Sequence, residues 1–546
     1  MKKIMTISLL IFFSMGNLPA QKNILEKSED QVKMFNAQQR FFAGDFQGAL
    51  NIYSDVLKGK PNDASLTFHI AECYFELGQY EQALENAEKA RSIDPKANEN
   101  IPLLLGKLYQ RNVKFEEALT EFANYKIVVA ADAKKIKESD VDYYIAQVNT
   151  AKDMMTKPVD VKIDNMGDLI NSEYDDKGPS ITADGKMLIF NSRRPGKSTK
   201  LDLEGDKKYF EDIYVSRWDS VNKLWSTAEL ITGSINTEGH DACTSISPDG
   251  KQIFIYKNDI ESESRGGDIY FSRLGSSGKW GAPQSMGKPI NTTYWEGGAC
   301  ISPDGKTLYF VSERPGGIGH SDIYMVNKKS RTEWDVPVNI GDVVNTTEDE
   351  GGIFLAPDGK SLFFSSKGHN SMGGYDIFKT VFDKGLWSTP QNLGYPINSI
   401  NNDVSFTISI DAQTGYFSSD RKGGLGERDI YKVDLTNYPV LEKEMKLKVV
   451  NLGPAMAILR GDIFNATDGN AMEAELFIYD AEGKQVGNTS SNSGSGEYFI
   501  TLEANKTYQV KINMPGYKPI DEKVEVKAAK EGATTVVKHY LLYKEK

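Results

Sequence analysis

The sequence predicts a multidomain chain with an all-α repeat array, a five-bladed all-β propeller and a C-terminal β-sandwich. Three observations support this: a helix-pair phrase recurs after 34 and then 35 residues, a hairpin turn recurs after 53 to 65 residues, and short alternating strands follow. A chain of 546 residues also exceeds one hydrophobic core. We expect a signal peptide at 1–20, the helical repeats at 30–157, the propeller at 158–440 and the sandwich at 444–546.

The first 20 residues have the composition of a secretory signal peptide. Lys2 and Lys3 precede an apolar run from Ile4 to Phe13, and Leu18 to Ala20 offers a cleavage site. The run is shorter than the roughly 20 apolar residues of a membrane span. We expect cleavage after Ala20 and export to the periplasm, with no lipid anchor because no cysteine follows the run.

The charge of the chain argues against nucleic acid as a partner. Removing the two lysines of the signal peptide changes the formal net charge from −12 to −14. Nucleic acids and anionic membrane surfaces repel such a chain, whereas a basic patch on another protein attracts it. The three cysteines, Cys73, Cys243 and Cys300, lack metal-ligand spacing, and we expect each to be a small buried apolar residue.

The helical repeats share small and aromatic residues at fixed positions. The phrase from Phe42 to Leu50 recurs from Glu76 to Leu84 and, more loosely, from Asn112 to Leu119. Each copy places an aromatic residue and then an alanine where two helices approach closely: Phe46 and Ala49, Tyr80 and Ala83, Phe115 and Ala118. These copies resemble the tetratricopeptide repeat. The resemblance implies a stack of helix pairs in which each pair buries its apolar face against a neighbour.

A further helix is expected from Ser139, as N-cap, to Met155. Val141, Tyr144, Ile145 and Val148 recur at helical spacing, so this helix would cover the open end of the stack. The concave surface of such an array would hold a peptide or a partner helix. The alternative is a purely structural spacer.

The middle of the chain repeats a hairpin turn four times, with a degraded fifth copy. Pro-Asp-Gly-Lys is such a turn because proline fixes φ and glycine supplies the positive φ. The aspartates of the five copies are Asp184, Asp249, Asp304, Asp358 and Asp411. Each turn lies between two predicted strands, a third strand begins at an Asp-Ile pair, and a fourth follows a tryptophan in four copies. This makes one four-stranded blade per copy.

The fifth copy lacks its fourth strand. Residues 159–167 precede the first copy, and the phrase from Met166 to Asn171 matches the blade junctions ending at Asn291, Asn345 and Asn398. We therefore expect residues 159–167 to supply the missing strand and to close the ring. The longest interval marks an insertion, a charged loop around Gly196 to Lys208.

The copies resemble the WD40-like repeat of TolB-type periplasmic propellers, most visibly where Ser312 to Gly317 and Ser419 to Gly424 precede Asp-Ile-Tyr. That resemblance implies that acidic residues before the first strand of each blade meet basic loops on one face. The candidate partner-binding residues there are Arg193, Arg194, Glu238, Asp241, Glu296, Arg314, Glu348, Glu350, Lys367 and Arg421. The alternative is that these charges pair with each other between blades.

The last hundred residues alternate in hydrophobicity, with turns every eight to twelve residues, which indicates a β-sandwich. The phrases Gly461-Asp462, Tyr479 to Gly483, Gly496-Glu497-Tyr498 and Met514 to Tyr517 resemble the carboxypeptidase regulatory-like domain. The resemblance implies a small module without catalysis.

We expect no enzyme, no cofactor and no metal. The five histidines are scattered over different units, and no Gly-x-Ser-x-Gly elbow is present. Because two carboxylates suffice for glycoside hydrolysis, a propeller glycosidase stays an alternative.

The order of modules resembles the PorE-type component of type IX secretion and gliding machinery. The resemblance implies a periplasmic scaffold at the outer membrane, whose partners are secretion or adhesin proteins, including a PorP- or SprF-like barrel. The family's OmpA-like domain, which binds peptidoglycan, has no counterpart here, so we do not expect direct peptidoglycan binding. Two alternatives stay open: the chain is truncated before such a domain, or it is a shortened relative that reaches the wall through a partner. The alternative function is a TolB-like or glycan-binding propeller that recognises a small ligand or polysaccharide.

Overall fold

The computed structural model describes most of the chain: residues 18–182, 184–202, 208–247, 250–258, 266–330, 333–438, 456–492, 496–527 and 534–545. Residues 1–17 of the predicted signal peptide lie outside this set, as do parts of the first two hairpin turns and of the charged insertion. The chain divides into two compact units, Met1–Ile145 and Ala146–Lys546.

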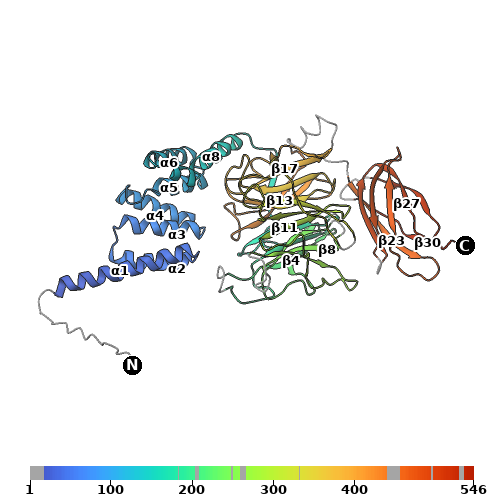
Figure 1. The fold of residues 1–546 in the computed structure, drawn as a ribbon, viewed down its shortest axis with the longest axis horizontal. Coiled ribbons are helices and arrows are strands. Elements are labelled where there is room, and N and C mark those ends of the chain that lie inside the picture. The colour runs from blue at the N-terminus through green and yellow to red at the C-terminus, as the bar shows by residue number, and fades with distance from the viewer. Residues whose placement is uncertain are drawn as a thin grey trace, which may run out of the picture. The chain divides into compact units, whose positions relative to one another are not determined.

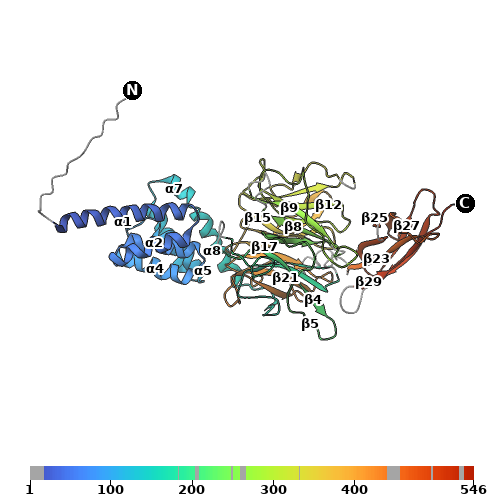
Figure 2. The same cartoon turned by 90° about the horizontal axis from the view of Figure 1, so that it is seen from below.

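The first unit is a series of antiparallel helix pairs in which each helix from α1 to α6 contacts the next (Figure 1). Its helices are α1 (Leu18–Phe42), α2 (Phe46–Gly59), α3 (Ala64–Glu76), α4 (Tyr80–Ile93), α5 (Ile101–Arg111), α6 (Phe115–Val128) and α7 (Ala133–Glu138). The long helix α1 runs beside α2 (Figure 2). The predicted repeat positions are confirmed, since Ala49, Ala83 and Ala118 are fully buried.

The turns between paired helices need a positive φ, and the repeats meet this need differently. Gly44 and Gly78 have φ of 80° and 73°, which glycine adopts without a steric penalty. In the third repeat Val113 takes φ of 60° at the corresponding turn. The looser sequence match of this repeat therefore reflects a substituted turn glycine, although the helix pair still forms.

The helix expected from Ser139 begins two residues later. Ser139 ends α7 instead of starting the next helix, and α8 (Val141–Met155) follows Asp140, whose φ is 52°. Within the first unit the ring of Tyr144 stacks on Phe122, with centroids 5.8 Å apart. Within the second unit Gln147 donates to the Ser371 hydroxyl at 3.2 Å and to the Gly373 carbonyl.

The second unit begins with five antiparallel sheets, whose strand order is the one predicted within each copy. The first sheet holds β2 (Asp176–Ile181), β3 (Met187–Ser192), β4 (Asp212–Asp219), β5 (Leu224–Trp225) and β6 (Glu229–Leu230). The second holds β7 (Asp241–Ile246), β8 (Gln252–Lys257), β9 (Asp268–Arg273) and β10 (Gln284–Ser285). The third holds β11 (Glu296–Ile301), β12 (Thr307–Ser312), β13 (Asp322–Asn327) and β14 (Val338–Asn339).

The remaining two sheets follow the same order. The fourth holds β15 (Glu350–Leu355), β16 (Ser361–Ser366), β17 (Asp376–Asp383), β18 (Leu386–Trp387) and β19 (Gln391–Asn392). The fifth holds β20 (Asp403–Ile408), β21 (Thr414–Ser419), β22 (Asp429–Asp434) and β1 (Lys162–Asn165). The strand supplied from before the first copy is confirmed, because β1 pairs antiparallel with β22 from Lys162 opposite Asp434 to Asn165 opposite Tyr431.

The five sheets form a closed ring through their first strands. Strands β2, β7, β11, β15 and β20 contact one another in this order, and β20 contacts β2. Each of these strands shifts register against its neighbour in the sheet at one β-bulge. A bulge increases the local twist of a strand, so the same irregularity recurs where the sheets converge.

One asparagine connects each sheet to the next. In all five junctions its side-chain amide makes two hydrogen bonds of 2.8 to 3.0 Å to the backbone N–H and C=O of one isoleucine in the preceding sheet. The pairs are Asn171 with Ile430, Asn236 with Ile213, Asn291 with Ile269, Asn345 with Ile323 and Asn398 with Ile377. The Asn171 pair joins the last sheet to the first.

The end of the chain folds into two sheets around a core of their own. One sheet contains β23 (Met456–Asn465), β26 (Glu497–Glu503), β29 (Thr534–Val537) and β30 (Tyr540–Leu542). The other contains β24 (Glu475–Tyr479), β25 (Gln485–Ser490), β27 (Lys506–Ile512) and β28 (Ile520–Val526). Leu459, Leu476, Tyr498 and Val510 are buried between them.

Replacing a junction asparagine should destabilise the ring of sheets. Asn345→Ala leaves the buried N–H of Ile323 without this partner, whereas the C=O of Ile323 keeps a hydrogen bond from the Ile340 N–H. A buried unpartnered group costs roughly 1–3 kcal/mol, so we expect the free energy of unfolding to fall by about 2 kcal/mol. The measurement is guanidinium unfolding followed by tryptophan fluorescence, which reports on this region because all six tryptophans lie between Trp218 and Trp387.

The matched control is Asn222→Ala, at an exposed turn where the side chain bonds to Asp219. We expect a change within about 0.5 kcal/mol. Equal losses for the two variants would contradict a special role for the junction asparagine.

Candidate functional site

The acidic residues that begin the first strands are buried and hydrogen-bonded. Asp176, Asp241, Glu296, Glu350 and Asp403 are at most 1% exposed. Each carboxylate accepts hydrogen bonds from the backbone N–H and the hydroxyl of a serine or threonine four residues earlier. These donors already satisfy much of the carboxylates' capacity to accept hydrogen bonds.

Three of these carboxylates pair with an arginine of their own sheet. The guanidinium lies 2.7 Å from Asp176 for Arg194, 3.4 Å from Glu296 for Arg314 and 2.5 Å from Asp403 for Arg421. Each arginine also donates to the backbone carbonyl of the residue before a junction asparagine and lies over two aromatic rings. The arginines therefore hold the sheets together at these junctions.

The second sheet uses a lysine for this purpose, since Lys257 lies 3.1 Å from Asp241. The fourth sheet differs, because Gly368 follows Ser366 by two residues, the spacing at which the first, third and fifth sheets have arginine. His369 fills the arginine's place there. Its Nε2 lies 2.9 Å from the Val344 carbonyl, and its ring contacts Phe364 and Phe378.

Glu350 in this fourth sheet is bonded by neutral donors. Thr346 and Ser366 donate to it at 2.7 to 2.9 Å. Burial is the largest influence on its ionisation and, together with the nearby Asp322 carboxylate, raises the pKa of Glu350 to about 7. Burial also lowers the pKa of His369. In the fourth sheet, Glu350 and His369 thus occupy the places that a carboxylate and a permanently charged arginine occupy in the first, third and fifth sheets, and both groups favour their neutral forms.

A buried charge network joins the fifth sheet to the first. Arg428 donates to Asp175 through two nitrogens at 2.7 and 2.6 Å, and Glu211 contacts Lys177 and Arg193. Burial opposes the ionisation of both acids, but these cations outweigh it and lower the pKa of Asp175 and of Glu211 to about 2. The junction between the fifth and the first sheet is therefore stabilised by ion pairs as well as by backbone hydrogen bonds.

The ten candidate residues on this face fall into two groups. Arg193, Arg194, Asp241, Glu296, Arg314, Glu350 and Arg421 take part in the buried contacts just described. Glu238, Glu348 and Lys367 are at least partly exposed, and Lys367 lies 2.7 Å from Asp349.

The charges of these candidate residues pair mostly within one sheet, so the alternative that they pair between blades is mostly wrong. The acid at the start of a first strand lies opposite the end of the second strand of the same sheet, as Asp176 does opposite Ser192. Partner binding at this face stays a prediction, for which the exposed side chains are the available contacts.

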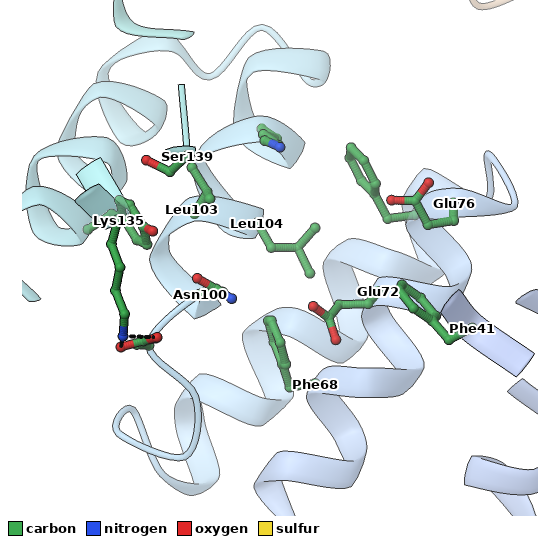
Figure 3. Close-up of a pocket in the computed structure, with 13 residues that line it drawn as sticks. Phe41, Phe68, Glu72, Glu76, Asn100, Leu103, Leu104, Lys135 and Ser139 are labelled. Carbon is green, nitrogen blue, oxygen red and sulfur yellow. Dashed lines mark hydrogen bonds and ion pairs between the residues drawn. The ribbon is translucent and has the colours of Figure 1, made fainter. Parts of the chain in front are cut away.

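The helical unit contains a groove with a cavity of about 430 Å³ (Figure 3). Its apolar lining comes mainly from the first helices of the pairs: Phe41, Phe68, Phe75, Leu103 and Leu104. Its charged lining consists of Glu72, Glu76, Glu99, Lys107 and Lys135. Apolar and polar side chains line this concavity in similar numbers, and binding sites are typically concavities of this size.

The charges of the groove are unevenly matched. Lys135 pairs with Glu99 at 2.7 Å, and the Lys107 ammonium lies 4.4 Å from the centre of the Tyr144 ring. Glu72 contacts Nδ1 of His69 at 2.7 Å. Solvent reaches the Glu76 side chain, but the groove walls remove part of its hydration and, with the Glu72 carboxylate, raise the pKa of Glu76 against the opposing effect of Lys107.

The sequence predicted a concave surface but none of these lining residues. A signal was available, because Phe68, Glu72 and Phe75 recur at spacings of four and three on one helix. In contrast, the expected burial of Cys73, Cys243 and Cys300 is confirmed.

Metal-binding clusters and membrane-spanning helices are both absent from the described residues. No group of three or more histidine, cysteine, aspartate or glutamate side chains there is arranged to hold a metal ion. Likewise, none of the helices in that part of the chain has the length and apolar composition needed to cross a membrane.

A tetratricopeptide repeat family model matches residues 43–85. Tetratricopeptide repeat protein 28 of Homo sapiens is 33% identical over 73 residues, 13% of this chain and 3% of that protein. TPR repeat-containing protein YpiA of Bacillus subtilis is 29% identical over 143 residues, 25% of this chain and 32% of that protein. The chain thus spans less than a third of these relatives. The residues matched by the family model lie within the repeats predicted from the sequence and support their resemblance to the tetratricopeptide repeat.

Two solved structures each match part of the chain. TolB from Acinetobacter baumannii matches over 50% of this chain and 57% of its own, at 17% identity and a TM-score of 0.30. The type III secretion translocator chaperone SycD from Yersinia enterocolitica matches over 25% of this chain and 97% of its own, at 15% identity and a TM-score of 0.23.

The fourth sheet should make the stability of the ring depend on pH. A raised carboxyl pKa means that the folded state favours the protonated form, so its contribution is present at low pH and is lost as pH rises from about 4.5 to about 7. Relative to Glu350→Gln, we expect the natural protein to lose on the order of 3 kcal/mol over this range. Guanidinium unfolding at a series of pH values, followed by tryptophan fluorescence, measures it.

Glu296→Gln in the third sheet is the comparison. This variant removes the carboxylate beside Arg314, so we expect it to be less stable than the natural protein at neutral pH. For Glu350→Gln we expect the opposite sign. A Glu350→Gln variant with the same pH profile as the natural protein would disprove the assignment.

Proposed function

We propose that this protein is a non-catalytic scaffold that binds protein partners through the groove of its tetratricopeptide repeats. The observation that carries the proposal is the cavity of about 430 Å³, which is lined by apolar side chains and by charged groups on the first helices of the pairs. Repeat arrays of this kind bind extended segments on their concave surface because stacking leaves that surface continuous.

The buried carboxylates of the ring argue for a non-catalytic scaffold and against a glycosidase. A glycosidase needs two carboxylates that face the substrate, whereas the recurring acids of the ring are buried and hydrogen-bonded to their own sheet. We interpret the ring as a five-bladed propeller of the TolB and WD40-like kind, and the C-terminal sheets as a carboxypeptidase regulatory-like sandwich. Exposed residues such as Glu238 and Glu348 would extend partner contacts to the propeller face.

We further propose that the protein acts in the periplasm at the outer membrane, as a PorE-type component of secretion or adhesin machinery. The order of signal peptide, helical repeats, propeller and sandwich supports this assignment. Its partners would then be other envelope proteins, including a PorP- or SprF-like barrel.

Removing apolar side-chain surface from the groove should weaken the binding of the partner. Leu103 is a half-buried lining residue, and Leu103→Ala removes apolar surface that a bound segment would cover. We expect crosslinked partner recovered from the native cells, quantified by mass spectrometry, to fall about fivefold, which corresponds to roughly 1 kcal/mol.

Val128→Ala is the matched control, because Val128 is an exposed apolar residue of α6 outside the groove. Partner recovery should not change for this variant. If both variants recover as much partner as the natural protein, the groove is not the binding surface.

The localisation is tested by the mass of the mature protein. Cleavage after Ala20 gives a chain that begins at Gln21, and intact-mass measurement of protein from the periplasmic fraction should show this species. Ala20→Leu replaces the small residue at the cleavage site, so unprocessed chain should accumulate. A full-length chain in the cytoplasmic fraction of unmodified cells would contradict the proposal.

A further inference from the structure

We propose that the groove selects a partner segment carrying a lysine or arginine next to apolar residues. This inference rests on the proposed function and adds the chemistry of the partner. It follows from how the charges of the groove are distributed and from which of them are already paired.

Two carboxylates lie together in the middle of the groove. Glu72 and Glu76 are four residues apart on α3, one helical turn, and both line the cavity beside Leu104 (Figure 3). The side chain of Glu72 is 27% exposed, so a bound residue can reach it. Like charges at this spacing repel each other, and a cation placed between them would relieve that repulsion.

The cations of the groove leave this pair undercompensated. Lys135 is bonded to both oxygens of Glu99, at 2.7 and 2.9 Å. Lys107 is the lining cation whose charge acts on Glu76, and its ammonium also covers the Tyr144 ring. Glu72 also contacts Nδ1 of His69 at 2.7 Å, so Lys107 is the lining lysine that acts on Glu76, and the lining as a whole carries one more acid than base.

The direction of the Glu76 pKa agrees with this distribution. The carboxylate is harder to ionise than usual because the groove walls and Glu72 disfavour its charge. A guest lysine or arginine would favour the ionised form, so part of the guest's binding energy comes from electrostatic complementarity. An acidic segment would instead disfavour the ionised form of Glu76 and would therefore bind more weakly.

The walls beside the carboxylates are apolar. Phe68 and Leu104 line the cavity from neighbouring helix pairs, and Phe75 lies between the two glutamates along α3. A segment with a basic residue flanked by apolar residues fits both features, because its charge reaches Glu72 and Glu76 while its neighbours cover the walls. The long aliphatic stems of lysine and arginine would also lie along apolar surface.

Selection from a library of phage-displayed random 12-residue peptides on the full chain tests the proposal. We expect enriched peptides to contain lysine or arginine beside apolar residues and to be poor in aspartate and glutamate. A synthetic consensus peptide should bind Glu72→Gln/Glu76→Gln about tenfold more weakly by fluorescence anisotropy, and raising the salt concentration should weaken its binding to the natural protein.

Glu85→Gln/Glu117→Gln is the charge-matched control. Both residues are exposed, lie on α4 and α6, and are outside the groove lining. This variant should bind the consensus peptide within twofold of the natural protein, and circular dichroism should show that both double variants keep their helices.

The outcomes separate this inference from the proposed function. Enrichment of acidic or uncharged peptides, or binding that is insensitive to Glu72→Gln/Glu76→Gln, would overturn the charge preference while Leu103→Ala still reduces partner recovery. If no peptide is enriched and Leu103→Ala also leaves partner recovery unchanged, both proposals fail.

Discussion

The ring of sheets depends on one side chain that imitates a peptide group. An asparagine amide offers a carbonyl and an N–H in one plane, so each junction asparagine bonds the N–H and the C=O of a single buried isoleucine, as Asn345 does with Ile323. Burying a backbone group without a partner costs free energy, and here the segment that leads to the next sheet supplies a partner for the isoleucine N–H and a second donor for its C=O. The asparagine thereby fixes the connecting segment to the preceding sheet. Asn171 makes the same contact with Ile430 between the last sheet and the first.

The buried ion pairs explain why a face rich in charge is mainly structural. Arg194, Arg314 and Arg421 use their planar guanidinium groups to connect a carboxylate, a backbone carbonyl and two aromatic rings at once. Arginine suits this role because it keeps its charge and forks toward several acceptors. In the fourth sheet, His369 keeps the contact with the carbonyl and the rings but can be neutral. The geometry of the junction is thus retained without the permanent charge.

Periodicity in the sequence predicted most of the fold, since the repeated turns, the junction phrase and the strand order are properties of short segments. It also predicted the closing strand, because residues 159–167 lie next to a phrase repeated at the other junctions. Two features escaped it for physical reasons. The start of α8 depends on Asp140, an aspartate at positive φ, and no local pattern marks that conformation. The pairing of charges within a sheet depends on strand register, which shows that Asp176 and Arg194 meet only once β2 and β3 are aligned.

The charges of the ring and of the groove differ in how far they are already paired, and this difference is the reason for proposing the groove as the binding site. On the ring, each recurring acid has hydroxyl and amide donors and most have a cation as well, so a ligand would have to compete with bonds already formed. In the groove, Glu72 contacts Nδ1 of His69, Glu76 is opposed by Lys107, and both carboxylates line a cavity beside apolar side chains. Charges that stabilise a fold are satisfied within it, whereas charges that select a partner must be left partly unsatisfied until the partner binds. This criterion favours the groove as the proposed partner site and assigns the recurring charges of the ring to the stability of the fold.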